Sequence, residues 1–259
     1  MFRRIVWPVV VFALFAAACS QSNEVPTRTH LQGEFAASDG TNMEYLVWLP
    51  NGYGEDRDKE YPLILFLHGS GAAEYDSEFV LSFGLPAVLE LDEEPDNFDF
   101  VVVSPQAAPG SAWWEDGQID VMDELLQEML DTYLVDPDRV YLTGLSMGGY
   151  GSWFLAAAYP ERYAAMVSTS GSGFQAIVLP PEEFACRLTE VPTWGLHGEQ
   201  DVIALYDLIH GVVQDYEELC NTTVEWTAYP DAGHFQTYER AYRDPALYDW
   251  MLSHTLAGR

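Results

Sequence analysis

Residues 139–151 read Arg-Val-Tyr-Leu-Thr-Gly-Leu-Ser-Met-Gly-Gly-Tyr-Gly, and this stretch decides the fold. An apolar run leads into a Gly-x-Ser-x-Gly motif, and a helical pattern rich in glycine and alanine follows it. A strand, a sharp turn and a helix in this order are the setting of a nucleophile elbow, whose strained turn pushes a serine forward. Gly144 and Gly148 leave room for that turn because they carry no side chain. The stretch therefore predicts Ser146 as a nucleophile at the end of a strand.

Apolar runs on either side of this stretch predict the other strands. With the run at 139–145 they cover 33–38, 43–49, 62–67, 98–104, 163–169, 192–196 and 223–229. Helical patterns cover 75–90, 117–134, 147–159, 202–219 and 245–256. Continuous apolar strands that alternate with helices are typical of a parallel sheet buried on both faces. We therefore expect a three-layer α/β fold, with a mostly parallel central sheet and helices on both faces. Asp39-Gly40 predicts a hairpin turn between the first two strands, and 170–191 is too short for a large lid.

Composition limits the kinds of partner. The chain of 259 residues is 48% hydrophobic, which suits one sizeable core. It carries 11 basic and 41 acidic residues, a net charge of −30. An acidic protein of this kind repels the phosphates of nucleic acid, so we expect no nucleic-acid partner.

The N-terminus has the pattern of an export signal. Arg3 and Arg4 precede an apolar run at 5–18 that is too short to span a bilayer. Small residues followed directly by Cys19 resemble the bacterial lipoprotein signal, in which that cysteine is lipidated. We therefore expect a signal peptide at 1–18, a polar tether at 19–29 and one domain at 30–259. The expected location is the bacterial cell envelope, anchored by lipid to the outer membrane or the periplasmic face. An ordinary signal peptide and a secreted protein are the alternative.

Two cysteines remain after such a cleavage. Cys186 and Cys220 each precede a predicted strand, which places both near the amino-terminal edge of neighbouring parallel strands. Because exported proteins meet an oxidising environment, we expect a structural disulfide between them, with two buried free thiols as the alternative. No Cys/His spacing of the zinc type occurs in the sequence, and we expect no metal site.

A serine nucleophile needs a base and an orienting acid. Of six histidines, His234 follows the last strand in the turn-rich sequence Asp-Ala-Gly-His-Phe, and it is the predicted base. Asp201 follows the strand at 192–196 and completes the chain order Ser…Asp…His. Glu199 is the competing carboxylate. His68 and His197 precede glycine at strand ends and are interpreted as structural.

The reaction also needs two N–H donors for an oxyanion. The backbone N–H of Met147 is one candidate, because it follows the nucleophile. The other is expected in His68-Gly69-Ser70-Gly71, with Ser70 favoured and Gly71 second. Trp113 and Trp114 follow the strand at 98–104, and we expect them either to form an aromatic substrate wall or to anchor their loop.

These motifs resemble the carboxylesterase and predicted-peptidase branch of the α/β-hydrolase superfamily, which includes phospholipase/carboxylesterase and feruloyl-esterase-like proteins. The resemblance covers about residues 40–255, and it is carried by Leu-Phe-Leu-His-Gly-Ser-Gly, the 136–151 stretch, His-Gly-Glu-Gln-Asp at 197–201 and Gly233-His234. It implies hydrolysis of carboxylic esters by Ser146, Asp201 and His234, without a cofactor.

Two alternatives stay open at this point. A serine peptidase of the prolyl-oligopeptidase-like type would use the same residues. A lipoprotein that kept the fold as a non-catalytic binding module would need none of the three.

Overall fold

The computed structural model describes residues 30–258 except 74–79, 97, 116 and 175–179. The expected signal peptide at 1–18 and the tether at 19–29 with Cys19 lie outside the described residues. Within the described ranges, none of the helices is both long enough and apolar enough to cross a membrane.

The centre of the described chain is an eight-stranded sheet with the order β1-β2-β4-β3-β5-β6-β7-β8. Strands β3 to β8 are parallel, whereas β2 pairs antiparallel with both β1 and β4. The strands are β1 (His30–Ala36), β2 (Asn42–Trp48), β3 (Tyr61–Leu67), β4 (Val101–Pro105), β5 (Val135–Leu145), β6 (Ala165–Thr169), β7 (Thr193–Gly198) and β8 (Glu225–Tyr229). The predicted fold class, a mostly parallel three-layer α/β fold, is confirmed.

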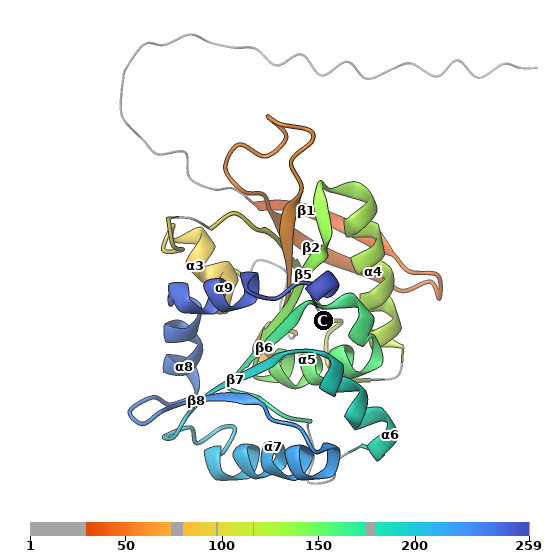
Figure 1. The fold of residues 1–259 in the computed structure, drawn as a ribbon. Coiled ribbons are helices and arrows are strands. Elements are labelled where there is room, and N and C mark those ends of the chain that lie inside the picture. Colours follow the sequence, from red (N-terminus) through yellow and green to blue (C-terminus); the bar gives the residue numbers. More distant parts are fainter. Residues whose placement is uncertain (1–29, 74–79, 97, 116, 175–179, 259) are drawn as a thin grey trace, which may run out of the picture.

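Helices cover both faces of this sheet, which Figure 1 shows nearly edge-on. The described helices are α1 (Ser70–Ala73), α3 (Gly84–Glu90), α4 (Gln118–Thr132), α5 (Met147–Ala158), α6 (Glu182–Ala185), α7 (Tyr206–Cys220), α8 (His234–Ala241) and α9 (Pro245–Leu252). Helices α3, α8 and α9 pack on one face, and α4, α5, α6 and α7 contribute to the core on the other. Short 3₁₀ segments complete the chain at η1 (Pro160–Arg162), η2 (Cys186–Glu190) and η3 (Leu256–Gly258).

The strands alternate between two hydrophobic cores. In β3, Leu63, Leu65 and Leu67 face the core under α4 and α5, whereas Ile64 and Phe66 face the core under α3, α8 and α9. Every residue of β3 is buried. A strand whose side chains point alternately into two cores must be apolar at every position, which explains the continuous apolar runs in the sequence.

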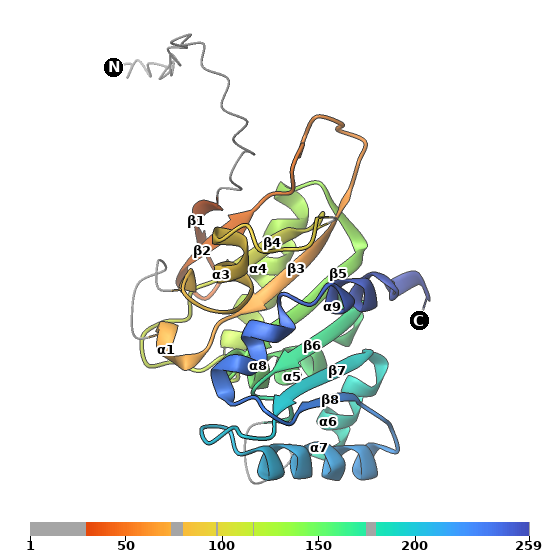
Figure 2. The ribbon, with the colours of Figure 1, turned by 90° about the vertical axis from the view of Figure 1, so that its left-hand side faces the viewer.

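Because β3 to β8 run in parallel, the loops that follow them gather at one edge of the sheet. Figure 2 shows this edge on the left, where α1, the start of α8 and the loop before α7 lie. Sequence patterns misplaced the start of one helix and missed another helix. The helix predicted at 202–219 begins at Tyr206, because Asp201 accepts the backbone N–H groups of Ile203 and Ala204 and forms a separate turn. Helix α8 was missed, because a short amphipathic stretch directly after a turn resembles a loop.

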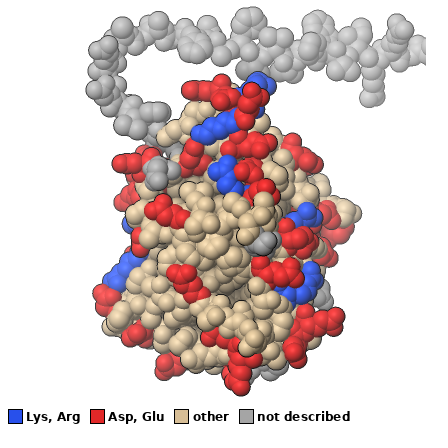
Figure 3. Space-filling model, viewed as in Figure 1, with Lys and Arg blue, Asp and Glu red and all other residues tan. Residues whose placement is uncertain are grey.

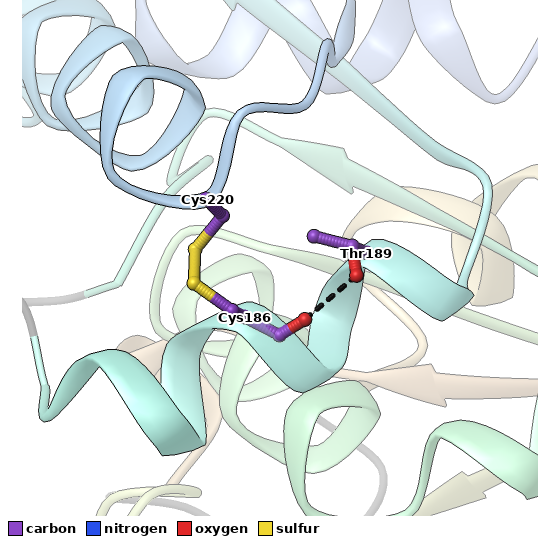
Figure 4. The surroundings of a disulfide bond; sticks show 3 residues. All are labelled: Cys186, Thr189 and Cys220. Atoms are coloured by element: carbon purple, nitrogen blue, oxygen red, sulfur yellow. Dashed lines mark hydrogen bonds between the residues drawn. A yellow bond between two sulfur atoms is a disulfide. The ribbon is translucent and has the colours of Figure 1, made fainter.

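Cys186 and Cys220 form a disulfide, which ties the 3₁₀ segment before β7 to the end of α7 (Figure 4). The Thr189 hydroxyl donates a hydrogen bond of 2.7 Å to the carbonyl oxygen of Cys186 and closes the same turn. Both cysteines precede their strands, so the bond lies away from the edge that carries the loops after β3 to β8.

The surface has the acidic character expected from the composition. Figure 3 shows acidic side chains spread over the face seen in Figure 1, with basic side chains at only a few places.

Candidate active site

Ser146 stands on a strained turn between β5 and α5. Its backbone has φ 53° and ψ −118°, a conformation that costs energy for any residue other than glycine. The turn is held by a hydrogen bond of 2.9 Å from the Ser146 N–H to the Thr169 carbonyl oxygen. A Cβ on Gly148 would overlap the carbonyl group of Leu67, so β3 and α5 approach as closely as only glycine allows. Close packing therefore forces the serine forward at the carboxyl edge of the sheet.

His234 and Asp201 meet at this edge from two further loops. His234 is the first residue of α8 and is buried. Its Nδ1 lies 2.7 Å from Oδ2 of the buried Asp201. Because a carboxylate only accepts hydrogen bonds, this contact places the imidazole proton on Nδ1 and leaves Nε2 as the acceptor. Glu199, the competing carboxylate, is exposed to solvent.

Asp201 is held by more than His234. Its Oδ1 accepts the backbone N–H groups of Ile203 and Ala204, each at 2.9 Å. His197 Nε2 lies 3.2 Å from Oδ2 and 2.8 Å from the carbonyl oxygen of Ala204. Burial by itself would raise the pKa of Asp201, but the hydrogen bonds from His197 and His234 outweigh it and hold that pKa well below its ordinary value.

His197 also contacts the candidate orienting acid, which the sequence pattern did not indicate. It is completely buried at the end of β7 and stacks on the indole of Trp226. Both neighbours of its Nε2 are acceptors, so this nitrogen must carry a proton and donate it. The sequence signal, a histidine before glycine at a strand end, is shared by His68, and nothing in it distinguishes the two.

Ser170 is a second residue that sequence reasoning missed. It follows β6 with φ 51°, and its buried hydroxyl donates a hydrogen bond of 2.8 Å to the His234 carbonyl oxygen. Its N–H donates to the carbonyl oxygen of Leu196 at 3.0 Å. Ser170 thus joins the loops after β6 and β8 and fixes where α8 begins. Ser170 belongs to a Ser-Gly-Ser sequence, and nothing in that sequence indicates this contact.

The predicted oxyanion donors flank Ser146. Met147 is the first residue of α5 and Ser70 the first of α1, so neither N–H has an acceptor within its own helix. Gly69 lies against the nucleophile, because a Cβ built on it would be 3.4 Å from Cβ of Ser146. The loop after β3 and the start of α5 therefore meet at the serine.

His68 and Trp113 hold the loop after β3 in place. His68 Nδ1 donates to the Gly69 carbonyl oxygen at 2.8 Å, and its Nε2 accepts the N–H of Ala107 at 3.0 Å. Trp113 Nε1 donates to the His68 carbonyl oxygen at 2.9 Å. Burial lowers the pKa of His68 from 6.5 to about 4, although its bond to Gly69 acts in the opposite direction.

This depressed pKa gives a prediction for stability. Between pH 6.5 and 4 the unfolded chain binds a proton at His68 and the folded chain does not, so lowering the pH favours unfolding. We expect His68 to account for a loss of about 3 kcal/mol over this range. His68→Gln should be less stable than wild type at pH 7 but should lose less stability when the pH is lowered to 4. Urea unfolding of both proteins at pH 7 and at pH 4 measures this. Equal losses in the two proteins would contradict the assignment.

A cavity of about 270 Å³ opens beside these groups. Ser70, Ser146 and His234 line it together. Its apolar and aromatic lining consists of Val80, Phe83, Leu145, Ile203, Phe235 and Tyr238. Trp113 and Trp114, the expected aromatic wall, are not among the lining residues. Trp113 is buried behind the loop after β3, and Trp114 packs on Tyr150 and Phe154 of α5. The aromatic wall is instead built by Phe83, Phe235 and Tyr238.

Within the part of the chain that the structure describes, no group of three or more His, Cys, Asp or Glu side chains is arranged to hold a metal ion.

Comparison with known proteins gives a family match over more than half of the chain. A family model described as "Putative esterase" matches residues 36–199. A bifunctional acetylxylan esterase/xylanase of Neocallimastix patriciarum is 25% identical over 190 residues, which are 71% of this chain and 25% of that protein. A poly(3-hydroxyalkanoate) depolymerase of Paucimonas lemoignei is 26% identical over 160 residues, 56% of this chain and 35% of that protein. The matched part of the chain thus spans only 25% and 35% of the length of these two relatives.

The fold is also similar to solved structures. A fluorophosphonate-binding serine hydrolase of Staphylococcus aureus superimposes with a TM-score of 0.68 at 15% identity, covering 87% of this chain and 98% of the other. At this identity the similarity concerns the fold alone.

Proposed function

Because this chain belongs to the esterase family whose model spans residues 36–199, we propose that it is a carboxylic ester hydrolase that forms an acyl-enzyme on Ser146. The observation that carries the proposal is the contact of 2.7 Å between His234 Nδ1 and the buried Asp201, beside a cavity that Ser146 and His234 both line. A strained serine, an oriented imidazole and a buried carboxylate are together what nucleophilic acyl transfer requires.

The proposed reaction proceeds in two steps. Ser146 Oγ attacks the ester carbonyl carbon while His234 Nε2 takes the hydroxyl proton. The tetrahedral intermediate then breaks the bond to the leaving oxygen, which receives that proton and departs as an alcohol. Water, activated by the same nitrogen, attacks the acyl-enzyme and releases the acid and the free serine. Asp201 keeps the imidazole proton on Nδ1 and stabilises the imidazolium of each step.

The backbone N–H groups of Met147 and Ser70 are the proposed donors to the oxyanion, with Gly71 as the alternative to Ser70. Met147 N–H also lies at the amino end of α5, where the helix dipole favours negative charge. His68 and Trp113 act on this step indirectly, because they fix the loop that presents Ser70.

Covalent labelling tests the nucleophile directly. A fluorophosphonate probe is expected to label the wild-type chain at Ser146, and Ser146→Ala is expected to abolish both the label and the hydrolysis of p-nitrophenyl acetate. The reaction should be stoichiometric, one probe for each chain, by mass spectrometry. Ser152 is the matched control: it is buried, and its hydroxyl donates to the Gly148 carbonyl oxygen, so Ser152→Ala should keep the label.

The same assay separates the competing functions. A label on Ser146 with hydrolysis of esters and not of peptide amides supports the proposal. Faster cleavage of peptide amides than of esters would make the chain a peptidase. A correctly folded chain with neither label nor hydrolysis would make it a binding module.

Export is a separate proposal that rests on residues outside the described structure. We propose that residues 1–18 are a signal peptide, that Cys19 is lipidated and that residues 30–259 form the catalytic domain held at a bacterial membrane. When cells that express the chain are grown with a clickable palmitate analogue, the wild-type chain should become labelled and the Cys19→Ser chain should not. An unlabelled wild-type chain recovered from the medium would instead indicate a secreted protein.

A further inference from the structure

An exposed apolar surface borders the cavity at the carboxyl edge of the sheet. Nine large hydrophobic side chains of the described residues are exposed, and five of them belong to two short segments of this edge. These five residues form what we call the apolar rim: Val202, Ile203, Leu205, Leu208 and Phe235, with exposed fractions of 83%, 60%, 53%, 51% and 49%. Exposed apolar residues that stand singly need no explanation, but a gathering of this kind marks an interaction site.

The rim is continuous with the catalytic cavity. Ile203 and Phe235 belong to both, because they line the cavity that contains Ser146 and are also 60% and 49% exposed. Val202 and Leu205 flank Ile203 in the chain, and Leu208 lies one helical turn beyond Leu205. Figure 2 shows the loop before α7 and the start of α8 on the same side of the sheet. An apolar molecule seated on the rim would thus contact Ile203 and Phe235, which also line the cavity.

Local structure keeps the rim exposed. Asp201 accepts the N–H groups of Ile203 and Ala204, which fixes the turn that carries Val202 and Ile203. His197 Nε2 donates to the carbonyl oxygen of Ala204, which is buried between the exposed Ile203 and Leu205. The groups that orient Asp201 therefore also turn these side chains outward.

The negative charge of the chain limits what kind of surface can bind to the rim. The chain has a net charge of −30, and the acidic residues Glu199, Asp207 and Glu239 stand exposed in or beside the two rim segments. An anionic lipid surface would be repelled by them. A neutral apolar surface would not be repelled, and it would remove the rim side chains from water.

We propose that the apolar rim docks the enzyme on the surface of a water-insoluble, uncharged ester, from which single ester groups enter the cavity. This inference rests on the proposed ester hydrolysis at Ser146. It adds a substrate class, because the cavity alone would serve equally for small soluble esters.

The test uses two rim residues that do not line the cavity. Val202→Ser/Leu205→Ser should lower the rate on emulsified tributyrin about tenfold, because two side chains no longer leave water on docking. Its kcat/KM on dissolved p-nitrophenyl acetate should stay within about twofold of wild type, since Ile203 and Phe235 are kept. The matched control is Leu31→Ser/Leu91→Ser, whose side chains are 48% and 61% exposed and lie outside the rim; it should behave as wild type on both substrates.

Docking can also be measured without hydrolysis. In a Ser146→Ala background, the chain with an intact rim should sediment with tributyrin droplets and the rim variant should stay in solution, whereas neither should bind vesicles of anionic phospholipid. Equal droplet binding by the two chains would overturn the proposal. So would a dimer of the wild-type chain that the rim substitutions convert to monomers, because the rim would then be a self-association surface. If the wild type did not hydrolyse p-nitrophenyl acetate, the proposed function would be refuted. The droplet assay would then still show whether the rim binds an apolar surface, because it does not depend on hydrolysis.

Discussion

Asp201→Asn is expected to lower kcat about 10⁴-fold while the chain stays folded. The carboxylate has two distinct sides. Oδ1 accepts the N–H groups of Ile203 and Ala204, so the oxygen of an Asn amide would stay there. Its NH₂ group would then take the place of Oδ2 and point its hydrogens at His234 Nδ1. To accept that hydrogen bond, His234 must move its own proton to Nε2, and it can no longer take the proton of Ser146.

His197 gives a second reason to expect a large effect of Asp201→Asn. Its Nε2 also donates toward Oδ2, so an amide at that position would place two donors against each other in a buried site. The measurement is kcat on p-nitrophenyl acetate at pH 7 to 8, with circular dichroism to show that the fold is kept. Glu199→Gln is the control, because the exposed Glu199 should change kcat less than about twofold. If Asp201→Asn lowered kcat by less than tenfold, the assigned role of Asp201 would be contradicted.

Gly148→Ala is expected to destabilise the fold by about 4 kcal/mol or more and to abolish activity. A methyl group there would overlap the carbonyl groups of Leu67 and His68, which are backbone atoms and cannot rotate away. Relief requires β3 and α5 to separate. Their separation would move the loop that carries Ser70 away from Ser146 and Met147. The two proposed N–H donors would then no longer point at the oxyanion, even in molecules that still fold.

Gly211→Ala is the matched control for that change. Gly211 lies inside α7, and a Cβ built on it has no atom within 4 Å. Alanine should stabilise this helix by about 1 kcal/mol, because it restricts the unfolded chain more than glycine does. Urea unfolding of the two variants beside wild type should therefore give opposite signs. If both variants were destabilised by a similar amount, the close approach of β3 and α5 at Gly148 would not be the cause of the destabilisation.

Some of the candidate site could be predicted because it depends on short-range patterns. The apolar run, the two glycines and the helix around Ser146 are neighbours in the chain, and sterics alone make that order a strained turn. The order Ser146, Asp201, His234 could likewise be predicted, since each follows an apolar strand and parallel strands end at one edge. The choice between Glu199 and Asp201 could be argued from the chain but not settled by it, because the two lie in the same turn.

The sequence by itself thus determined most of the strands, their mostly parallel arrangement and the turn at Ser146, because these depend on local residue patterns and on the alternation of strands and helices along the chain. Only the tertiary structure decided which groups from different loops touch: His197 on Asp201, Ser170 on His234, and a cavity wall of Phe83, Phe235 and Tyr238 in place of Trp113 and Trp114. These contacts depend on strand order and on the path of each loop, and a polar or aromatic side chain carries no local sign of the partner it will meet across the sheet edge.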